Sequence, residues 1–245
     1  MNPQYSDAYL NEYYGRYHPH DIPVEEYLVS LPDAVGVNNF YFSLIEKHVP
    51  PGKLLDFGCG QGVLLHIAQK RGWTAYGYEI DCEVAARVAR KLGVPISCGD
   101  AFRHEIQGAP FRAILLNQVL EHVREPGRLL VRLFESLEDE GVLFVATPNI
   151  SSFSNTMKYF MEKIGIRKRK VGNYYATDHH LWYFSPRTLS KTLQLSGFEV
   201  IHESGTRRIR KNQTKLAQHL RWHCWEKRHL ASGLICLGRK RSQET

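Results

Sequence analysis

A glycine-rich loop lies where an apolar stretch of the chain meets a helix-like one. Residues 54–57 are apolar except for Asp56, and helical spacing begins at residue 63. Between them stand three glycines: Gly58, Gly60 and Gly62. Glycine accepts backbone torsions that a Cβ resists and lets a ligand approach the main chain. A helix start adds free N–H groups and the positive end of the helix dipole. The loop is therefore a candidate cofactor site.

An acidic residue further along the chain makes this interpretation more specific. Glu79 ends the next apolar stretch, 21 residues beyond Gly58. A carboxylate at this place can accept hydrogen bonds from both ribose hydroxyls of an adenosine-type cofactor. A nicotinamide dinucleotide normally accompanies a G-x-G-x-x-G loop, whereas this loop reads G-x-G-x-G and follows Asp56. That acid would repel a pyrophosphate but suits the free ammonium group of S-adenosylmethionine.

Short apolar stretches alternate with helical ones through most of the chain. Strands are expected at 54–57, 73–79, 95–98, 111–117, 141–147, 197–201 and 234–237. The 3.6-residue spacing of apolar side chains, with proline and glycine at the ends, predicts helices at 35–49, 63–71, 83–92, 126–137 and 186–196. Strands separated by helices predict an α/β fold, with a parallel sheet and helices on both of its faces.

Five of these motifs resemble those of the class I S-adenosylmethionine-dependent methyltransferases, over residues 35–240. Residues 54–62, 76–81, 98–102 and 117–123 look like that family's first four motifs, and 141–149 look like its fifth strand and exit. The resemblance implies a Rossmann-like, doubly wound, mostly parallel seven-stranded sheet, with S-adenosylmethionine as the cofactor. It implies that Glu79 binds the ribose and that Asp100 meets the adenine amino group. The cofactor-binding positions it implies are Asp56, Gly58, Cys59, Gly60, Glu79, Ile80, Asp100, Ala101, Asn117 and Val119.

The candidates for proton chemistry are Glu121, His122 and His180. An oxygen acceptor needs a base that removes its proton, or a metal ion that lowers the hydroxyl pKa. The stretch from His180 to the Phe-Ser-Pro at 184–186 is similar to the segment after the fifth strand in ubiquinone-biosynthesis-type O-methyltransferases. In that group and in the small-RNA 2′-O-methyltransferases, the fourth motif reads E-x-x-E-H and binds Mg²⁺. The resemblance therefore implies O-methylation.

Gln118 departs from that pattern, because it stands at the position of the first glutamate. A neutral amide is a poorer ligand for a hard divalent cation than a carboxylate. We therefore predict no bound metal, with a Mg²⁺ site at Glu121, His122 and His180 as the open alternative. Without a metal, His122 or His180 acts directly as the base. The structural alternative for Glu121 and His122 is a hydrogen-bonded pair that shapes the site without taking a proton. For His179 we expect an exposed loop position.

The net charge of +7 hides a division along the chain. Residues 1–150 carry 13 Lys and Arg against 19 Asp and Glu, whereas residues 151–245 carry 19 against 6. The basic residues gather largely in two predicted insertions, 150–180 and 206–231, and near the C-terminus. We therefore expect an acceptor that can be anionic: a small molecule, a sugar or a lipid-linked intermediate.

Three alternatives stay open. The first is RNA 2′-O-methylation, although no RNA-binding module is recognisable. The second is weak peripheral contact with an anionic membrane through residues 215–230, a moderately amphipathic stretch. The third is a relative that binds the cofactor without catalysis.

The remaining expectations concern domains and location. Residues 1–34 are rich in tyrosine and are expected to form an N-terminal cap near the cofactor, since aromatic rings attract cations. Residues 35–245 form the predicted methyltransferase domain. The N-terminus lacks a secretory signal pattern, and no apolar stretch is long enough for a membrane span. Five scattered cysteines predict neither a disulfide framework nor a zinc knuckle and favour a reducing cytosol. We expect a cytoplasmic protein, with a membrane-peripheral one as the alternative.

Overall fold

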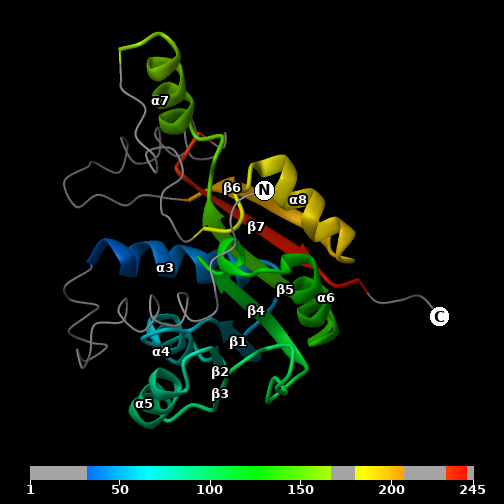
Figure 1. The fold of residues 1–245 in the computed structure, drawn as a ribbon. Coiled ribbons are helices and arrows are strands. Elements are labelled where there is room, and N and C mark those ends of the chain that lie inside the picture. Colours follow the sequence, from blue (N-terminus) through cyan, green and yellow to red (C-terminus); the bar gives the residue numbers. More distant parts are fainter. Residues whose placement is uncertain (1–31, 167–179, 207–229, 242–245) are drawn as a thin grey trace.

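The computed structural model describes residues 32–166, 180–206 and 230–241. In this part of the chain, a seven-stranded sheet runs in the order β3-β2-β1-β4-β5-β7-β6 (Figure 1). The strands are β1 (Lys53–Phe57), β2 (Thr74–Glu79), β3 (Ile96–Cys98), β4 (Phe111–Asn117), β5 (Leu137–Pro148), β6 (Glu199–Gly205) and β7 (Gly233–Arg239). Strands β1 to β5 are parallel to one another, while β7 runs antiparallel to both β5 and β6. The predicted mostly parallel, seven-stranded α/β sheet is confirmed.

Helices cover both faces of the sheet (Figure 1). On one face lie α3 (Pro32–Ile45), α4 (Val63–Lys70) and α5 (Cys82–Leu92); on the other lie α6 (Pro126–Glu135) and α8 (Pro186–Leu195). Successive strand residues point to opposite faces, so Leu54 packs in the first core and Leu55 in the second. Both side chains are fully buried. Because both faces are covered, the strands can be apolar throughout, and only their ends remain open to a ligand.

Side-chain caps start two of these helices directly after their strands or loops. The Asp81 carboxylate accepts hydrogen bonds from the N–H groups of Glu83 and Val84 at the start of α5. Ser185 and Thr188 form a reciprocal capping box at the start of α8. These caps satisfy N–H groups that a helix start leaves unpaired. The chain therefore turns from β2 into α5 within two residues, which keeps Glu79 at the edge of the sheet.

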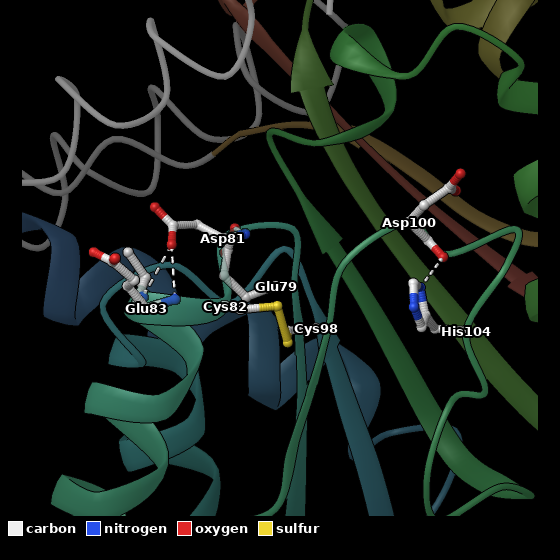
Figure 2. Close-up of a disulfide and its surroundings, with 8 residues drawn as sticks. Glu79, Asp81, Cys82, Glu83, Cys98, Asp100 and His104 are labelled. Atoms are coloured by element: carbon white, nitrogen blue, oxygen red, sulfur yellow. Dashed lines mark hydrogen bonds between the residues drawn. A yellow bond between two sulfur atoms is a disulfide. The ribbon is translucent and has the colours of Figure 1, made fainter. Parts of the chain in front are cut away.

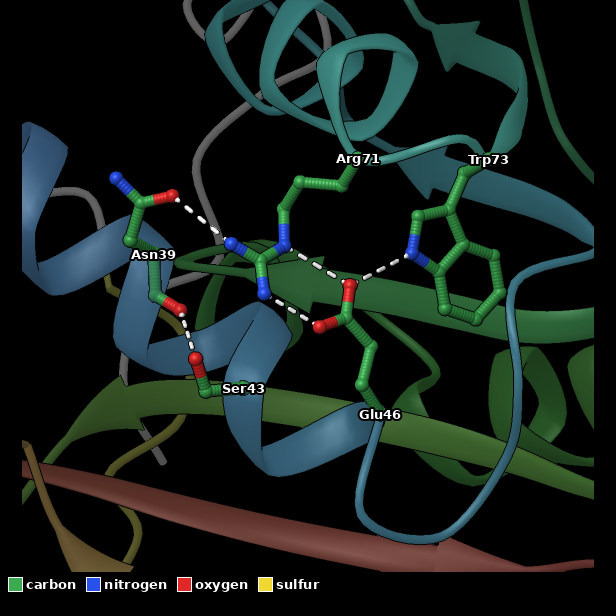
Figure 3. Close-up of polar contacts among 5 residues, drawn as sticks. All are labelled: Asn39, Ser43, Glu46, Arg71 and Trp73. Atoms are coloured by element: carbon green, nitrogen blue, oxygen red, sulfur yellow. Dashed lines mark hydrogen bonds and ion pairs between the residues drawn. The ribbon is translucent and has the colours of Figure 1, made fainter.

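A polar network fastens α3 to the turn that leads into β2 (Figure 3). Arg71 donates from Nε (2.9 Å) and Nη2 to the two carboxylate oxygens of Glu46, and the indole N–H of Trp73 donates to Glu46 Oε1 (3.1 Å). Arg71 Nη1 also donates to Asn39 Oδ1 (3.4 Å). The pKa of Glu46 is lowered, mainly by the hydrogen bond from Arg71. Residues from three segments therefore hold the first described helix against the sheet.

The boundaries of some elements differ from the predicted ones. Strand β5 begins at Leu137, inside the predicted helix and before the predicted strand, because Leu137 pairs with Phe111 across an irregularity between β4 and β5. The helix that precedes it ends at Glu135. The register irregularity lets the polar residues 138–140 continue the strand. A prediction from the spacing of apolar residues along the chain does not include pairing between strands.

The two predicted insertions are only partly described. The first begins with α7 (Phe153–Lys163), which projects from the body of the sheet and buries none of its side chains against the described residues (Figure 1). The tyrosine-rich N-terminal segment, His179, the basic run 167–170 and residues 215–229 lie outside the described residues. Among the described helices, none has the length and apolar character that crossing a bilayer requires.

The expectation from the scattered cysteines is wrong for one pair. Cys82 and Cys98 are joined by a disulfide, with their Cα atoms 5.1 Å apart (Figure 2). The two residues are 16 apart in sequence, but β2 and β3 are neighbours, and Cys98 ends β3 beside the turn that leads from β2 to Cys82. Of the other cysteines in the described ranges, Cys59 and Cys236 are free and buried.

Candidate active site

The carboxyl ends of the parallel strands bring the predicted site residues to one edge of the sheet. The strand-ending residues there are Phe57, Glu79, Cys98, Asn117 and Pro148. The chain order reverses between β1 and β4, which is where open α/β sheets bind ligands. The glycine loop follows β1 at this switch point, and the candidate catalytic residues follow β4. Both predicted groups therefore share one edge.

The glycine loop is bonded to the end of β2. The N–H groups of Gly58 and Cys59 donate to the carbonyl of Tyr78 (2.7 and 3.1 Å), and Gly60 N–H donates to Glu79 Oε2 (2.8 Å). Gly58 has φ of 77°, in the left-handed region, and a Cβ there would lie 2.6 Å from Val119 Cγ2. Glycine is required at position 58 both for its torsion and for the close approach of Val119.

Asp56 lies within β1 and is almost completely buried. Burial, and to a smaller extent the negative charge of Glu79, raise the pKa of its carboxyl group to about 7. An acid in this state gains a proton or a cationic partner easily. The ammonium group of S-adenosylmethionine is such a partner, and its assignment to Asp56 stays a prediction.

The predicted adenine side is built by the ends of β2 and β3. Gly99 N–H donates to the Glu79 carbonyl (3.1 Å), and Asp100 Oδ1 accepts a hydrogen bond from Phe102 N–H (2.8 Å). Asp100 is exposed, and so is the side chain of Ile80 at 54%. An exposed apolar side chain between two acids is suited to cover a purine ring. Ala101 is half-buried and packs against the second core.

The loop after β4 carries the strained residue of the site. Gln118 has φ of 58°, which is uncommon for a residue with a side chain. Its side-chain amide donates to the carbonyl of Ala146 at 3.3 Å, and its backbone N–H donates to the same oxygen at 2.8 Å. The torsion is thus held by β5, and it directs the chain into the short helix η1 (Leu120–His122). Asn117 and Val119, the other predicted positions here, are half-buried.

Glu121, His122 and His180 come together, although 58 residues separate the two histidines. One potential ligand atom from each residue lies within 4.8 Å of the others, and the two imidazole centroids are 4.8 Å apart with nearly perpendicular rings. Glu121 and His180 are buried, at 1% and 8% exposure, and His122 is half-buried. The predicted catalytic trio therefore forms one cluster, one turn beyond the residue that packs on Gly58.

Main-chain hydrogen bonds bring the second histidine to this cluster. The N–H groups of Leu181 and Trp182 donate to the carbonyl of Glu121 (2.8 and 3.1 Å). The Trp182 indole N–H donates to the carbonyl of Val123 (2.9 Å). Ile150 N–H also donates to the carbonyl of Phe184 (2.9 Å), beside an isolated bridge between Phe184 and Asn149, the residue that follows β5. The segment that begins at His180 is therefore docked on η1.

Burial sets the protonation of Glu121. It raises the pKa of this carboxyl group to about 7, against two hydrogen bonds that lower it, one of them from Thr147. The Thr147 hydroxyl donates to Glu121 Oε2 at 2.9 Å, whereas Oε1 is buried and has no hydrogen-bond partner among the described residues. One carboxylate oxygen is thus anchored, and the other is available to an imidazole N–H, a cation or a substrate hydroxyl.

The ligand atoms of this cluster indicate which kind of metal ion it could bind. A buried carboxylate oxygen and two imidazoles within reach of one another can hold a divalent ion. Two imidazoles and one carboxylate suit zinc or iron better than Mg²⁺, which prefers oxygen ligands. The Gln118 amide is engaged with Ala146. The residues therefore fit a transition metal, and the prediction of no bound metal stays a prediction.

A family model described as a methyltransferase domain matches residues 38–203, which is most of the described fold and includes both halves of the site. The chain belongs to this methyltransferase family. The predicted family is thereby confirmed, and S-adenosylmethionine is the cofactor that the family supports.

Individual relatives agree with this membership. The ubiquinone biosynthesis O-methyltransferase of Agrobacterium fabrum is 26% identical over 158 residues, covering 62% of each chain. That of Caulobacter vibrioides is 34% identical over 102 residues, covering 39% of this chain and 40% of the relative. The chain thus spans less than two thirds of these relatives' lengths.

Solved structures share the fold of this methyltransferase. A possible histamine N-methyltransferase from Thermotoga maritima has a TM-score of 0.59 at 19% identity, covering 96% of this chain and 97% of that one. The magnesium protoporphyrin IX methyltransferase of Synechocystis, with bound S-adenosylhomocysteine, has a TM-score of 0.58 at 13% identity, covering 96% and 95%. At these identities the likeness concerns the fold.

Two features of the site were missed from the sequence. Thr147 was assigned only to a strand, although its hydroxyl anchors the carboxyl group of Glu121. A threonine at the carboxyl end of an otherwise apolar strand is a polar side chain at the ligand edge, and that signal could have found it. The Cys82–Cys98 disulfide beside Glu79 was also missed. The assigned roles of the predicted site residues remain predictions.

Proposed function

We propose that this methyltransferase transfers the methyl group of S-adenosylmethionine to a hydroxyl oxygen of a small-molecule, sugar or lipid-linked acceptor. The single observation that carries the proposal is the cluster of Glu121, His122 and His180 at the edge that also holds the glycine loop. Val119 packs over Gly58, and η1 begins at the next residue, so the two parts of the site are adjacent. The ubiquinone biosynthesis O-methyltransferases among the relatives support oxygen as the methylated atom.

When bound, the cofactor would supply a methyl group activated by its sulfonium, and in-line attack of an acceptor oxygen on the methyl carbon would release the sulfur as the neutral thioether of S-adenosylhomocysteine. The chain's own residues hold the cofactor and the acceptor in this alignment, which accounts for much of the rate in such reactions. We assign the ribose hydroxyls to Glu79, the adenine to Asp100 and Ile80, and the ammonium group to Asp56. Glu79 is positioned for this by hydrogen bonds from Gly60 and Asp81 N–H.

Proton removal falls to the histidines. A hydroxyl group is a weak nucleophile until it loses its proton, and an imidazole within hydrogen-bond reach can accept that proton. Oε1 of Glu121 is available to orient an imidazole and to stabilise the imidazolium that results. His122 is half-buried and can meet the acceptor, whereas His180 packs against it edge to face. We therefore assign the base to His122 and a supporting role to His180.

The test uses methyl-labelled S-adenosylmethionine and a panel of phenolic, sugar and polyprenyl-phosphate acceptors. With an acceptor that is methylated, His122→Ala should lower kcat by about 10²–10⁴-fold, while S-adenosylhomocysteine binding stays unchanged. His180→Ala should reduce kcat less. The matched control is His202→Ala, since this histidine lies on the far edge strand β6 and contacts Ser204. Unchanged turnover in His122→Ala would refute the proposed base.

A metal-assisted reaction is the second candidate, favoured by the two adjacent imidazoles and by Glu121 Oε1, which no described residue hydrogen-bonds. A bound ion would lower the pKa of the acceptor hydroxyl in place of a base. Metal analysis of the purified protein, and assays after chelation with Zn²⁺, Mn²⁺ or Mg²⁺ added back, separate the two mechanisms. Activity that survives chelation supports the histidine base. Activity restored by one ion alone supports the metal.

The acceptor class has its own test. Methylation of RNA, with affinity that falls steeply as salt rises, would replace the proposed acceptor by a nucleic acid. Methylation of an anionic small molecule or polyprenyl phosphate, with RNA neither bound nor modified, would support the proposal. The basic excess of residues 151–245 is compatible with both classes, so only the measured substrate decides.

A further inference from the structure

Two cysteines connect the loops that carry the cofactor acids. Cys82 is the first residue of α5, directly behind Glu79 and the helix cap Asp81. Cys98 ends β3, two residues before Asp100. Figure 2 shows the disulfide between them, with the acids of both loops around it. The bond thus ties the predicted ribose side of the site to the predicted adenine side.

The strand on the adenine side is otherwise held by few contacts. β3 has three residues, lies at the edge of the sheet and pairs with β2 through Gly77–Ile96, Tyr78–Ser97 and Glu79–Cys98. All three of its side chains are only half-buried. Short edge elements with little burial open locally at low free-energy cost. A covalent link at the carboxyl end of β3 therefore restrains the part of the sheet that is easiest to displace.

The restrained spacing is the one that a bound adenosine would span. Gly99 N–H donates to the Glu79 carbonyl (3.1 Å), which fixes how far the loop of Asp100 lies from that of Glu79. The Glu79 carboxylate is itself fixed by N–H groups of Gly60 and Asp81. A shift at Cys98 would consequently move Asp100 relative to Glu79 while the glycine loop stays in place.

The two residues of the disulfide differ in their exposure to solvent. Cys82 is exposed and Cys98 is half-buried, in contrast to the buried free thiols of Cys59 and Cys236. A thiolate can therefore reach Cys82 first, and exchange at a disulfide depends on such access.

We propose that Cys82 and Cys98 form a reversible redox site that sets the affinity for the adenosyl cofactor, with the disulfide as the tight-binding form. In reduction, a thiolate of a dithiol attacks Cys82 Sγ, the S–S bond breaks, and Cys98 leaves as a thiolate that takes up a proton. The second thiol of the reductant then displaces Cys82, which also becomes a thiol. The dithiol is oxidised to a disulfide as the protein disulfide is reduced. The inference rests on the adenosyl cofactor and is independent of the acceptor.

Thermodynamic linkage gives this proposal a second measurable consequence. If the disulfide strengthens cofactor binding by some factor, bound cofactor must favour the disulfide over the dithiol by the same factor. Saturating S-adenosylhomocysteine should therefore shift the dithiol–disulfide equilibrium of this pair towards the oxidised form. A disulfide that serves only global stability would not respond in this matched way.

The experiment compares S-adenosylhomocysteine binding to the full chain, by calorimetry, before and after reduction with dithiothreitol. Alkylation and mass spectrometry assign the state of each cysteine. We expect the dissociation constant to rise by at least about fivefold on reduction. In glutathione redox buffers, the ligand should raise the disulfide-to-dithiol ratio by the same factor. The control is Cys82→Ser with Cys98→Ser, which keeps the other three cysteines and should bind equally with and without dithiothreitol. Cys82→Ser alone, at an exposed position, serves if the double variant fails to fold.

Several results would overturn the proposal. Equal affinity of the oxidised and reduced protein would do so, as would complete alkylation of Cys82 and Cys98 in oxidising buffer. A response to dithiothreitol that persists in the serine variants would move the effect to another thiol. Absence of binding in both forms would overturn this proposal together with the cofactor assignment. Normal, redox-sensitive binding without methyl transfer would count only against the proposed hydroxyl chemistry.

Discussion

The hydroxyl of Thr147, at the end of β5, donates a 2.9 Å hydrogen bond to the carboxyl group of Glu121, just after β4. Both side chains are buried, and the pKa of Glu121 is about 7 because burial raises it more than this bond and a backbone hydrogen bond lower it. In Thr147→Val the donor is lost while the side-chain shape is kept. We expect the Glu121 pKa to rise further and the free energy of unfolding to fall by about 1–2 kcal/mol. Urea denaturation measures the stability.

The same substitution should move the acidic limb of the pH–rate profile to higher pH, because the ionised form of Glu121 supports the histidine base. Thr147→Ser keeps the hydroxyl and is the matched control, with a limb at the position of the parent protein. An acidic limb that stays in place in Thr147→Val would show that Glu121 does not govern this step.

Asp56 predicts a pH dependence of stability. Its pKa is about 7 in the folded protein against 3.8 for a free carboxyl group, mainly because of burial. Between these values the folded state keeps a proton that the unfolded state has released. The free energy of unfolding therefore falls as pH rises from about 4 to about 7, and this contribution is lost in Asp56→Asn. Urea denaturation at pH 5 and pH 8 should show a smaller decline in the variant, since the other titrating groups are shared.

The same acid predicts a pH dependence of cofactor binding. The ionised carboxylate attracts the ammonium group of the cofactor, so affinity for S-adenosylhomocysteine should rise as pH increases through about 7. In Asp56→Asn the affinity should be weaker above pH 7 and nearly independent of pH across this interval. Calorimetry in two buffers with different ionisation enthalpies reports the proton that binding releases. Identical proton release in both proteins would exclude Asp56.

Gly58→Ala tests the glycine loop, and Gly72→Ala is its matched control. Both glycines have positive φ, 77° and 84°, but a Cβ meets Val119 at 2.6 Å only at position 58 and finds no described atom within 4 Å at position 72. The control should lose about 1 kcal/mol of stability from the torsion alone. Gly58→Ala should lose a further 1–3 kcal/mol, roughly, from overpacking, and should bind S-adenosylhomocysteine weakly. Adding Val119→Ala should restore part of both losses, because it removes the contacting methyl groups.

The network of Glu46, Arg71 and Trp73 predicts a stability loss without a catalytic one (Figure 3). Glu46→Gln replaces the charged acceptor, and we expect it to lower the free energy of unfolding by about 1–2 kcal/mol at pH 7. The folded-state pKa of Glu46 is lowered, so its contribution is present above the unfolded pKa near 4.5 and lost as pH falls. The difference between the two proteins should therefore shrink in acid. A loss of S-adenosylhomocysteine affinity in the variant would place this network in the site instead.

Local sequence signals predicted that the glycine loop and Glu79 lie at one edge of the sheet. β1, Gly58 and Glu79 follow one another in consecutive apolar stretches and turns of the sequence. Parallel pairing then places the carboxyl ends of the strands at one edge of the sheet. The pairing of Thr147 with Glu121 could not be read in this way, since it depends on the register between β4 and β5. The same is true of the Cys82–Cys98 bond, which follows from how three residues of β3 align on β2. The register between two strands depends on how distant segments pack together, so a single stretch of the sequence does not reveal it.

Asn149 joins the end of β5 to the residues that lead into β7. Its N–H donates to the Ser232 carbonyl and its side-chain amide donates to that of Ala231, while its own carbonyl accepts from the amide of Asn155. Polypeptide leaving β5 and polypeptide returning to β7 are thus joined at one buried residue. Between these two points, His180, α8 and β6 belong to the site and the sheet, whereas residues 153–179 and 207–229 lie outside them. Grafts confined to those two segments would exchange the acceptor preference of one relative for that of another while Asn149, His122 and His180 stay in place.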